Sequence, residues 1–372
     1  MTKSILHIIT SLDQGGAQTI LYNICRQDCN IHHQIIYLSK GSFYREKFLS
    51  LGIRPVLINF TLLNFLLSSY RLFRYIQFLK PCAVQTWLYH SDLIGGVISR
   101  LAGIKNISWG IHHSHHTFRS SKLTTLFIVS VSALFSYFIP KNIIYCAYSA
   151  KKFHENVFFS KNKSIVIPNG YDPEQYINSL TLRNEFRLKH NLDVKHLVLG
   201  CAARFHPVKD HKNLFESLSI IKNSGVNFSL LLAGDHIDHN NLTLMSLIED
   251  YDLSEYVILL GNYSLINCFY NAIDILLLSS ISEAFPNVIF ESLMSGTPCV
   301  STNVGDLHLV APLQPYLSPP EQPQYLANNI LKLLSDIRNN QATVSPSSLR
   351  HYALTNHSLD SMINMYSQVW YS

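Results

Sequence analysis

Short apolar runs alternate along this 372-residue chain with longer stretches whose apolar positions recur at helical spacing. An apolar run of four to eight residues bounded by turn formers is typical of a buried strand in a parallel sheet. We predict strands at residues 5–10, 33–39, 83–88, 107–113 and 164–169, and again at 197–204, 228–234, 256–261, 275–280 and 298–303. This alternation predicts an α/β fold with two doubly wound parallel sheets.

The boundary between the two predicted domains lies in PNGYDPEQY (168–176), which is rich in turn formers. We therefore expect a Rossmann-like N-terminal domain at 1–170 and a Rossmann-like C-terminal domain at 171–357. The last helix, about 358–372, is expected to pack back on the first domain. Hydrophobic residues make up 47% of the chain, which is enough for two cores.

Cysteine usage and the N-terminus bear on the compartment. Seven cysteines are scattered without a Cys-x-x-Cys pair, so the spacing predicts neither a disulfide framework nor a zinc ribbon. A reducing compartment fits this usage. The N-terminus has one lysine, a short apolar run and no small-residue cleavage site, which predicts a first strand rather than a signal peptide. We expect a cytoplasmic protein.

Charge divides the chain into a basic and an acidic part. Residues 1–168 carry 18 Lys and Arg against 5 Asp and Glu, whereas residues 169–372 carry 11 against 19. This asymmetry indicates a polyanionic partner, either nucleic acid or an anionic membrane surface, unless it is a chance distribution of solvated charges. Because no module with interleaved exposed aromatics is recognisable, nucleic acid is the least favoured partner.

The segment 60–81 predicts a helix with a wide apolar side. Its polar positions recur every three or four residues as Asn64, Ser68, Arg71, Arg74 and Gln77. Such a helix could lie in a membrane interface, or it could pack on the sheet with its basic stripe outward. A second apolar segment, 126–140, is too short to span a membrane and ends at a proline.

Two glutamates separated by seven residues stand out in ISEAFPNVIFESLMSGTP, residues 281–298. Glu283 follows a predicted strand, and Glu291 lies about a turn and a half into a helix that Gly296 ends. The first N–H groups of this helix suit a phosphate, and a carboxylate accepts hydrogen bonds from hydroxyl groups. The phosphate slot would comprise Phe285, Pro286, Asn287 and Val288. This layout fits a nucleoside diphosphate sugar; the alternative is two ordinary surface carboxylates.

Positive groups for a diphosphate follow the first strand of the second half. Arg204 closes that strand, and Lys209 lies in the loop after it, where parallel sheets bind ligands. Gly15 and Gly16 follow the first strand of the chain and allow close backbone approach at a helix start. Each feature alone is weak, because a basic loop is usually solvated. No Gly-x-Gly-x-x-Gly follows a strand, which disfavours a dinucleotide-binding dehydrogenase.

Together these residues resemble retaining glycosyltransferases of the GT-B fold, glycosyltransferase family 4. The spaced glutamate pair is that family's signature, and residues 283–306 resemble its most typical segment. VIPNGYD (166–172) and LLLAGD (230–235) extend the resemblance over nearly the whole chain. WLYHSDLIGG (87–96) and WGIHHS (109–114) resemble bacterial capsule, O-antigen or exopolysaccharide transferases. The resemblance implies two Rossmann-like domains facing across a cleft.

The resemblance also implies residue roles. Arg204 and Lys209 would bind the diphosphate, Glu283 the donor sugar and Glu291 the ribose, with Gly15, Gly16 and residues 285–288 around the phosphates. His112 is the best match to the family's histidine at the end of an N-domain strand, with His113 second. His90 is an acceptor-side candidate that could equally cap a turn. Gln18, where the family often has glutamate, and Asp235–His236, where many members have a second glycine, leave the nucleotide open.

The resemblance implies retaining hexosyl transfer from a nucleoside diphosphate sugar to a lipid-linked or saccharide acceptor, with no cofactor. We expect the transfer to be metal-independent, because Arg204, Lys209 and the helix start are suited to stabilise the leaving diphosphate. The HHSHH run at 112–116 is not expected to bind metal, because adjacent histidines rarely converge on one ion. The expected acceptor is a polyprenyl-diphosphate-linked saccharide of cell-surface polysaccharide synthesis, which would place the protein peripherally on the inner face of the membrane. Alternatives are a GT-B nucleotide-sugar 2-epimerase, a sugar phosphorylase or a non-catalytic nucleotide-sugar-binding subunit. The sequence leaves the sugar, base, linkage and oligomeric state open.

Overall fold

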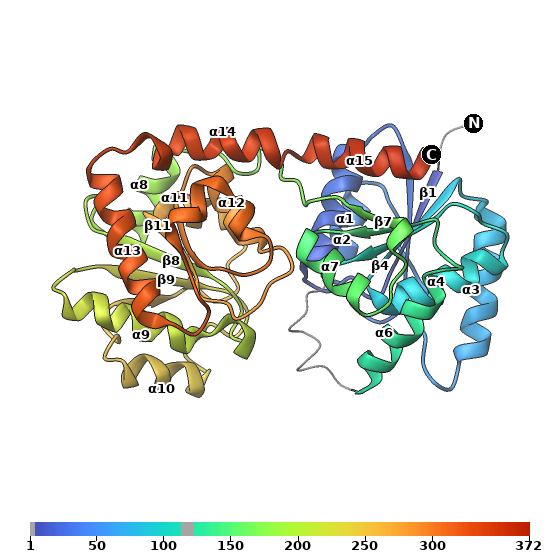
Figure 1. Cartoon of the computed structure of the whole chain (residues 1–372), viewed down its shortest axis with the longest axis horizontal. Helices are drawn as coiled ribbons and strands as arrows, with labels where there is room; N and C mark the ends of the chain where they lie inside the picture. Colours follow the sequence, from blue (N-terminus) through green and yellow to red (C-terminus); the bar gives the residue numbers. More distant parts are fainter. Residues whose placement is uncertain (1–3, 113–122) are drawn as a thin grey trace. The chain divides into compact units, whose positions relative to one another are not determined.

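The chain forms two compact units in the computed structural model, which describes residues 4–112 and 123–372 (Figure 1). Unit 1 comprises Met1–Gly170 and Leu359–Ser372, and unit 2 comprises Tyr171–Ser358. Each unit contains one parallel sheet. Most of the strand residues are buried, as expected for parallel sheets that are covered by helices.

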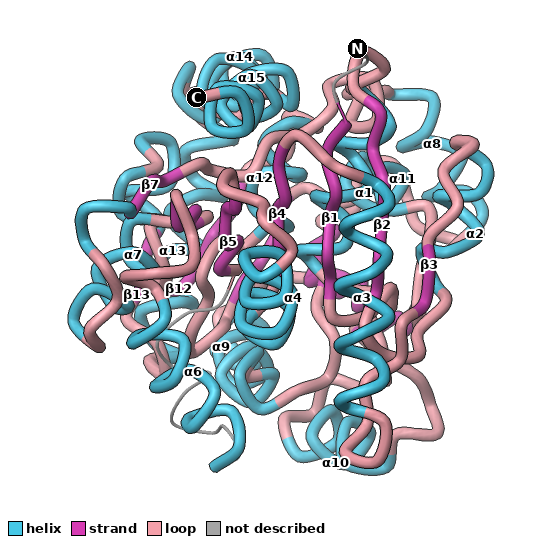
Figure 2. The backbone as a smooth tube through the Cα atoms, turned by 90° about the vertical axis from the view of Figure 1, so that its right-hand side faces the viewer, coloured by secondary structure: helices cyan, strands magenta, loops and turns pink. Residues whose placement is uncertain are grey.

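The sheet of unit 1 has the strand order β3-β2-β1-β4-β5-β6-β7, part of which Figure 2 shows side by side. Its strands are β1 (Ser4–Ile9), β2 (His32–Tyr37), β3 (Val56–Leu57), β4 (Ala83–Trp87), β5 (Ile107–Ile111), β6 (Asn142–Tyr145) and β7 (Ser164–Val166). The connecting helices are α1 (Gly16–Gln27), α2 (Phe43–Ser50), α3 (Phe65–Leu79), α4 (Tyr89–Leu101), α6 (Leu123–Phe135), α7 (Tyr148–Asn156) and the 3₁₀ turn η1 (Lys161–Lys163). The order follows the Rossmann arrangement with one further strand.

The last helix, α15 (Leu359–Tyr371), belongs to unit 1 although the chain reaches it from unit 2. It contacts α1 and β4, and its apolar side chains join the same core as β1 and α1. Trp370 anchors its end: the indole N–H donates to Oε1 of Gln85 at 3.1 Å, and Asn106 donates to the carbonyl of Trp370 at 2.6 Å.

Unit 2 has the strand order β10-β9-β8-β11-β12-β13. Its strands are β8 (Val198–Ala202), β9 (Ser229–Ala233), β10 (Val257–Leu259), β11 (Ile275–Leu278), β12 (Cys299–Thr302) and β13 (Leu317–Ser318). Its α-helices are α8 (Leu180–Lys189), α9 (His211–Asn223), α10 (Leu242–Asp250), α11 (Ile266–Ala272), α12 (Asn287–Met294), α13 (Pro323–Arg338) and α14 (Pro346–Asn356). Short 3₁₀ turns are η2 (Pro207–Lys209), η3 (Leu307–Leu309), η4 (Ala311–Tyr316) and η5 (Ala342–Val344).

The predicted α/β class and doubly wound sheets are confirmed, and all ten predicted strands are present. The pattern missed β3, β6 and β13. β3 and β13 have only two residues each, which is too short for a periodic signal. β6 has four residues, NIIY, and joins β5 to β7 in the sheet.

The predicted polar stripe of the 60–81 segment does not face outward as a whole. Within α3 the buried residues are Ser68, Leu72 and Ile76, and the hydroxyl of Ser68 donates to the carbonyl of Asn59 at 2.7 Å. The apolar residues left exposed are Leu62, Leu63, Phe65, Leu66, Leu67, Tyr70 and Phe78. The helix therefore packs through a narrow stripe and leaves most of its apolar surface uncovered. None of the helices that the structure describes has the length and hydropathy needed to cross a bilayer.

Candidate functional site at the strand ends of unit 2

The loops after β8 and β11 bring three predicted residues to one point of the sheet of unit 2. β8 and β11 are neighbouring strands, and the chain order runs away from this pair in opposite directions. Parallel sheets bind ligands outside the carboxyl ends of strands at such a switch point. Arg204 and Lys209 follow β8, and Glu283 follows β11.

Lys209 and Glu283 form an ion pair, with Nζ and Oε1 2.5 Å apart. Their side chains are 21% and 15% exposed, so solvent screens the pair only in part. The hydroxyl of Ser280 also donates to Oε1 of Glu283 at 2.7 Å. Both contacts use Oε1, so Oε2 is left without a partner among the described residues. The two residues predicted to bind the diphosphate and the sugar thus form an ion pair with each other.

The loop that carries Lys209 is fixed to the loop after β11. The N–H of Ile281 donates to the carbonyl of Val208 at 2.8 Å, and the hydroxyl of Ser279 donates to the carbonyl of Lys209 at the same distance. Asp210, in the left-handed region at φ 48°, caps α9 by accepting the N–H of Asn213. These bonds fix the backbone of Lys209 relative to Glu283.

Arg204 supplies a second positive charge at the carboxyl end of β8. Burial lowers the pKa of His206, and both Arg204 and Lys209 are close enough to His206 to lower it further. It is exposed, and within the described part of the chain its guanidinium forms no hydrogen bond or ion pair. A guanidinium offers a planar fork of donors that matches phosphate oxygens. Lys209 is compensated by a carboxylate, so Arg204 is the group whose charge is open to an incoming anion.

Helix α12 begins close in sequence to Glu283, and its first turn keeps donors for an anion. Its N-cap is Pro286, and no side chain caps the helix among the residues described. Phe285 stacks on Phe290 with ring centroids 4.3 Å apart, which fixes the approach to the helix. Oδ1 of Asn287 accepts the hydroxyl of Tyr171 at 2.7 Å, and Val288 is half-buried. A helix start without a cap combines backbone donors with the positive end of the helix dipole.

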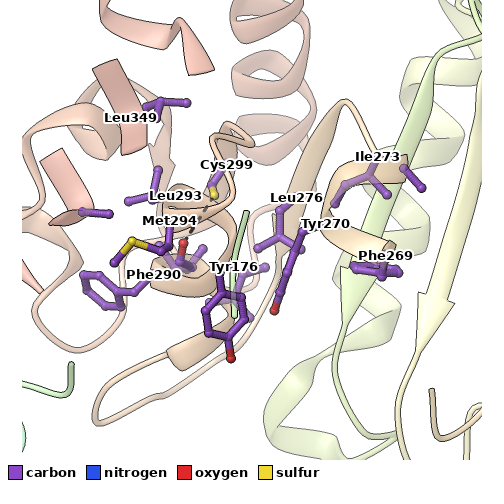
Figure 3. Packing of buried hydrophobic residues seen from close by; sticks show 14 of the residues in the cluster. Tyr176, Phe269, Tyr270, Ile273, Leu276, Phe290, Leu293, Met294, Cys299 and Leu349 are labelled. Carbon is purple, nitrogen blue, oxygen red and sulfur yellow. Dashed lines mark hydrogen bonds between the residues drawn. The ribbon is translucent and has the colours of Figure 1, made fainter. Parts of the chain in front are cut away.

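Glu291 lies on α12 beside two tyrosines that the sequence reasoning missed. The hydroxyl of Tyr270 donates to Oε2 of Glu291 at 2.7 Å. Burial raises the pKa of Glu291, and hydrogen bonds from Tyr270 and Tyr176 act in the opposite direction. Figure 3 shows both tyrosines in the core cluster to which Phe290, Leu293 and Met294 of α12 also belong. The sequence indicates only that these two aromatic residues are buried, because the hydrogen-bond partner of a tyrosine hydroxyl cannot be predicted from the local pattern.

The candidates of unit 1 lie at the strand ends of its own sheet. Gly15 is the N-cap of α1 and Gly16 its first residue; a Cβ on Gly15 would lie 2.5 Å from Oε1 of Gln18. His90 is exposed in the first turn of α4, after β4. His112 follows β5 and is half-buried. His113 lies outside the described residues.

A group of three buried residues in unit 1 has potential metal ligands close together. The ligand atoms of His7, Cys25 and His33 lie within 4.8 Å of one another. The indole of Trp87, which can only donate, donates to Nδ1 of His7 at 3.3 Å. His7 therefore carries its proton on Nε2 and donates it to Nδ1 of His33 at 2.9 Å. If Nε2 of His7 bound a metal, the proton of the neutral ring would have to lie on Nδ1. Nδ1 would then point a hydrogen at the indole N–H instead of accepting from it. These residues therefore do not fit a metal.

One Asp-x-Asp triplet, Asp250-Tyr251-Asp252, occurs in the sequence. It lies where α10 ends and leads into β10, which is the opposite end of the sheet from Arg204, Lys209 and Glu283. Asp252 forms an ion pair with Lys222. The triplet is therefore not placed to hold a metal at the candidate site.

Residues 183–345 match the family model described as Glycosyl transferases group 1. Unit 2 carries a glycosyl transferases group 1 domain. The matched range contains Arg204, Lys209, Glu283 and Glu291. The chain is also similar to the putative glycosyltransferase EpsF of Bacillus subtilis, with 26% identity over 320 residues that cover 80% of this chain and 78% of that protein. The predicted resemblance to glycosyltransferases is confirmed at this level.

Two further comparisons extend this result. An Escherichia coli protein named UDP-Gal:alpha-D-GlcNAc-diphosphoundecaprenol alpha-1,3-galactosyltransferase is 26% identical over 255 residues, which cover 66% of this chain and 64% of that protein. The crystal structure of Anabaena Alr3699/HepE in complex with UDP-glucose matches with a TM-score of 0.85 and 18% identity, covering 98% of both chains. The structural match confirms the GT-B fold around the group 1 domain.

Proposed function

We propose that this glycosyltransferase transfers a sugar, with retention of anomeric configuration, from a nucleoside diphosphate sugar to a lipid-linked or saccharide acceptor in cell-surface polysaccharide synthesis. The observation that carries the proposal is the Lys209–Glu283 ion pair, together with the exposed guanidinium of Arg204 at the end of the neighbouring strand β8. It combines cations for a diphosphate with a carboxylate for sugar hydroxyls at the switch point of one sheet. The similar Anabaena structure is a complex with UDP-glucose, which is consistent with such a donor.

The chemistry requires stabilisation of the leaving diphosphate while the sugar passes through an oxocarbenium-like transition state. In our proposal Arg204, Lys209 and the start of α12 supply the positive potential where negative charge grows. Oε2 of Glu283 accepts hydrogen bonds from hydroxyl groups of the sugar, and the carboxylate of Glu291 accepts hydrogen bonds from the ribose hydroxyls. Retention follows from attack on the face from which the diphosphate leaves: the acceptor oxygen bonds to the anomeric carbon, the bond to the diphosphate breaks, and the acceptor proton passes to the departing phosphate oxygen. The positive groups of the chain itself make a divalent metal unnecessary in this scheme.

The acceptor side is assigned to unit 1, with His112 as a polar group at the acceptor hydroxyl and His90 as a further candidate. A polyprenyl-diphosphate-linked saccharide is the proposed acceptor. The Escherichia coli relative is named for a diphosphoundecaprenol acceptor, which supports this class. The excess of positive charge in residues 1–168 is consistent with an anionic acceptor and with an anionic membrane that contains it.

The donor assignment is tested by thermal shift with UDP-, GDP-, ADP-, CMP- and dTDP-sugars, with EDTA or with Mg²⁺. We expect one nucleotide family to raise the melting temperature by several degrees in EDTA, because a ligand that binds only the folded state stabilises it. Glu291→Ala should remove the shift, and Glu249→Ala, at an exposed position of α10, should retain it. A shift that needs Mg²⁺ would contradict the metal-independent scheme, and a full shift in Glu291→Ala would contradict the ribose role.

We further propose that α3 and the residues before it place unit 1 on an anionic membrane. Leu62 and Leu63 are completely exposed, and Leu66 and Phe78 are 83% and 79% exposed. An apolar patch of this kind on a monomer marks an interaction surface. The exposed guanidinium groups of Arg71 and Arg74 lie on the same helix and would meet anionic headgroups.

Charge removal on α3 should weaken this membrane binding. Each basic group near an anionic surface contributes about 1 kcal/mol, so Arg71→Gln/Arg74→Gln should lower vesicle affinity by about 10- to 30-fold. The measurement is flotation with vesicles of phosphatidylglycerol and phosphatidylcholine. Arg338→Gln/Lys332→Gln, on α13 of unit 2, is the control of equal charge. Equal flotation of the two double variants would contradict the assignment of membrane binding to α3. Equal flotation of the wild-type protein with vesicles of phosphatidylcholine only would contradict the role of anionic headgroups.

A further inference from the structure

The indole of Trp87 connects a candidate site residue with the buried core of unit 1. Trp87 is the last residue of β4 and is fully buried. Its ring stacks on the imidazole of His112, with centroids 5.3 Å apart and an interplanar angle of 22°. Next to it lies the ring of Tyr366 of α15, at 5.8 Å. The indole therefore lies between the end of β5 and the C-terminal helix.

Hydrogen bonding fixes the indole in its own plane. Its N–H donates to Nδ1 of His7, which lies on β1, and His7 in turn donates to His33 on β2. Burial lowers the pKa of His7 well below its usual range and that of His33 to about 4. Both imidazoles are therefore neutral at neutral pH, and Nδ1 of His7 stays an acceptor for the indole.

We propose that Trp87 is a positioning residue for His112: the indole face fixes the orientation of the imidazole. The proposal rests on the role assigned to His112 in the proposed function. Stacking occupies the faces of an imidazole, whereas its hydrogen bonds are made at the edge, so the contact with Trp87 does not compete with a hydrogen bond to the acceptor hydroxyl. The strand holds the backbone only as far as Ile111, so the direction of the ring depends on its neighbours.

This arrangement predicts a kinetic effect of a particular kind. A small misplacement of a group that meets the acceptor can cost about 100-fold in rate without a change in donor binding. Trp87→Leu removes the aromatic face, and we expect kcat to fall about 10- to 100-fold while the donor KM changes less than about 2-fold. Trp87→Phe keeps a ring but loses the N–H donor, and should recover most of the rate.

The matched control is Trp370→Leu. Trp370 is also a buried tryptophan of unit 1 and also contacts His7, at 5.5 Å, but the structure records no ring contact between it and His112 among the described residues. Its loss should destabilise the core in a comparable way without disturbing the His112 ring. A decrease in kcat for Trp87→Leu that Trp370→Leu reproduces would mark a general packing effect and overturn the proposal.

A direct measurement does not depend on knowing the donor. With ¹³C-labelled histidine, the Cε1–H signal of His112, assigned by its loss in His112→Gln, should carry the ring-current shift of the indole. The signal should move in Trp87→Leu, move less in Trp87→Phe and stay in Trp370→Leu. An unmoved signal in both Trp87 variants overturns the stacking. A moved signal with unchanged kcat overturns the positioning role. Full turnover in His112→Gln would instead refute the proposed function of His112 and leave the measured stacking intact.

Discussion

Replacing Glu283 with glutamine should abolish sugar transfer and strengthen the binding of free UDP. In the structure Glu283 pairs with Lys209, and in the proposed function its Oε2 accepts hydrogen bonds from the sugar. Glutamine replaces one carboxylate oxygen with an NH2 donor and removes the negative charge, so it accepts hydrogen bonds from the sugar hydroxyls less well, and we expect kcat to fall about 100-fold or more. The same change frees Lys209 from its partner. An ion pair of this exposure contributes about 1 kcal/mol, so UDP affinity should rise by about fivefold.

Lys209→Met should have the opposite effect on UDP affinity. That variant loses the cation, so it should lose both UDP affinity and transfer, and the double variant should show strong coupling in a thermodynamic cycle. Glu255→Gln, an exposed glutamate of unit 2, serves as the control. Titration calorimetry with UDP measures the binding. Equal losses of UDP affinity in Glu283→Gln and Lys209→Met would contradict the competition between the diphosphate and Glu283.

The sequence predicts the class of this site but not the ion pair between Lys209 and Glu283. Arg204, Lys209 and Glu283 are expected together because each follows a buried strand, and ligands gather at such strand ends. That Lys209 and Glu283 neutralise each other depends on the neighbouring positions of β8 and β11 in the sheet. Seventy-four residues separate the two partners in the chain, and no local pattern carries that pairing.

The aromatic neighbours of the site were not predictable for a different reason. Tyr270 and Trp87 occupy positions whose periodicity is that of core residues, and both are buried in the core. The hydroxyl of Tyr270 also donates to Glu291, and the ring face of Trp87 also stacks on His112. Hydrophobic patterning reports burial and is silent about which polar atom a buried aromatic residue meets.

The α3 segment shows that hydrophobic patterning also does not decide which face of an amphipathic helix is buried. Its pattern predicts one polar stripe on an apolar helix, and periodicity does not decide which side finds a partner. The structure buries Ser68 with Leu72 and Ile76 and leaves Leu66 in solvent. The carbonyl of Asn59 in the preceding loop accepts a hydrogen bond from Ser68, so this polar residue is satisfied on the buried face.

Replacing Arg187 with methionine should cost unit 2 about 3–5 kcal/mol of its free energy of unfolding, which is typical of breaking a buried charge network. Arg187 is fully buried, and its guanidinium pairs with Asp274 at 2.9 Å. It also donates to backbone carbonyls of Ala272, Asp193, Val194 and His196. Methionine has a similar length but no donor, so it would leave these buried carbonyls and part of the carboxylate without partners.

The positions of the tryptophans allow the loss of stability in Arg187→Met to be assigned to one unit. All three, Trp87, Trp109 and Trp370, belong to unit 1, so their fluorescence follows the urea unfolding of that unit alone. Far-UV circular dichroism follows both units. In Arg187→Met we expect an early transition by circular dichroism while the fluorescence midpoint stays in place. Arg183→Met, whose side chain shares Asp274 but is 20% exposed, should cost about 1–2 kcal/mol. Equal costs in the two variants would contradict the view that burial of the charge sets the penalty, and an unshifted transition in Arg187→Met would contradict its place at the centre of the network.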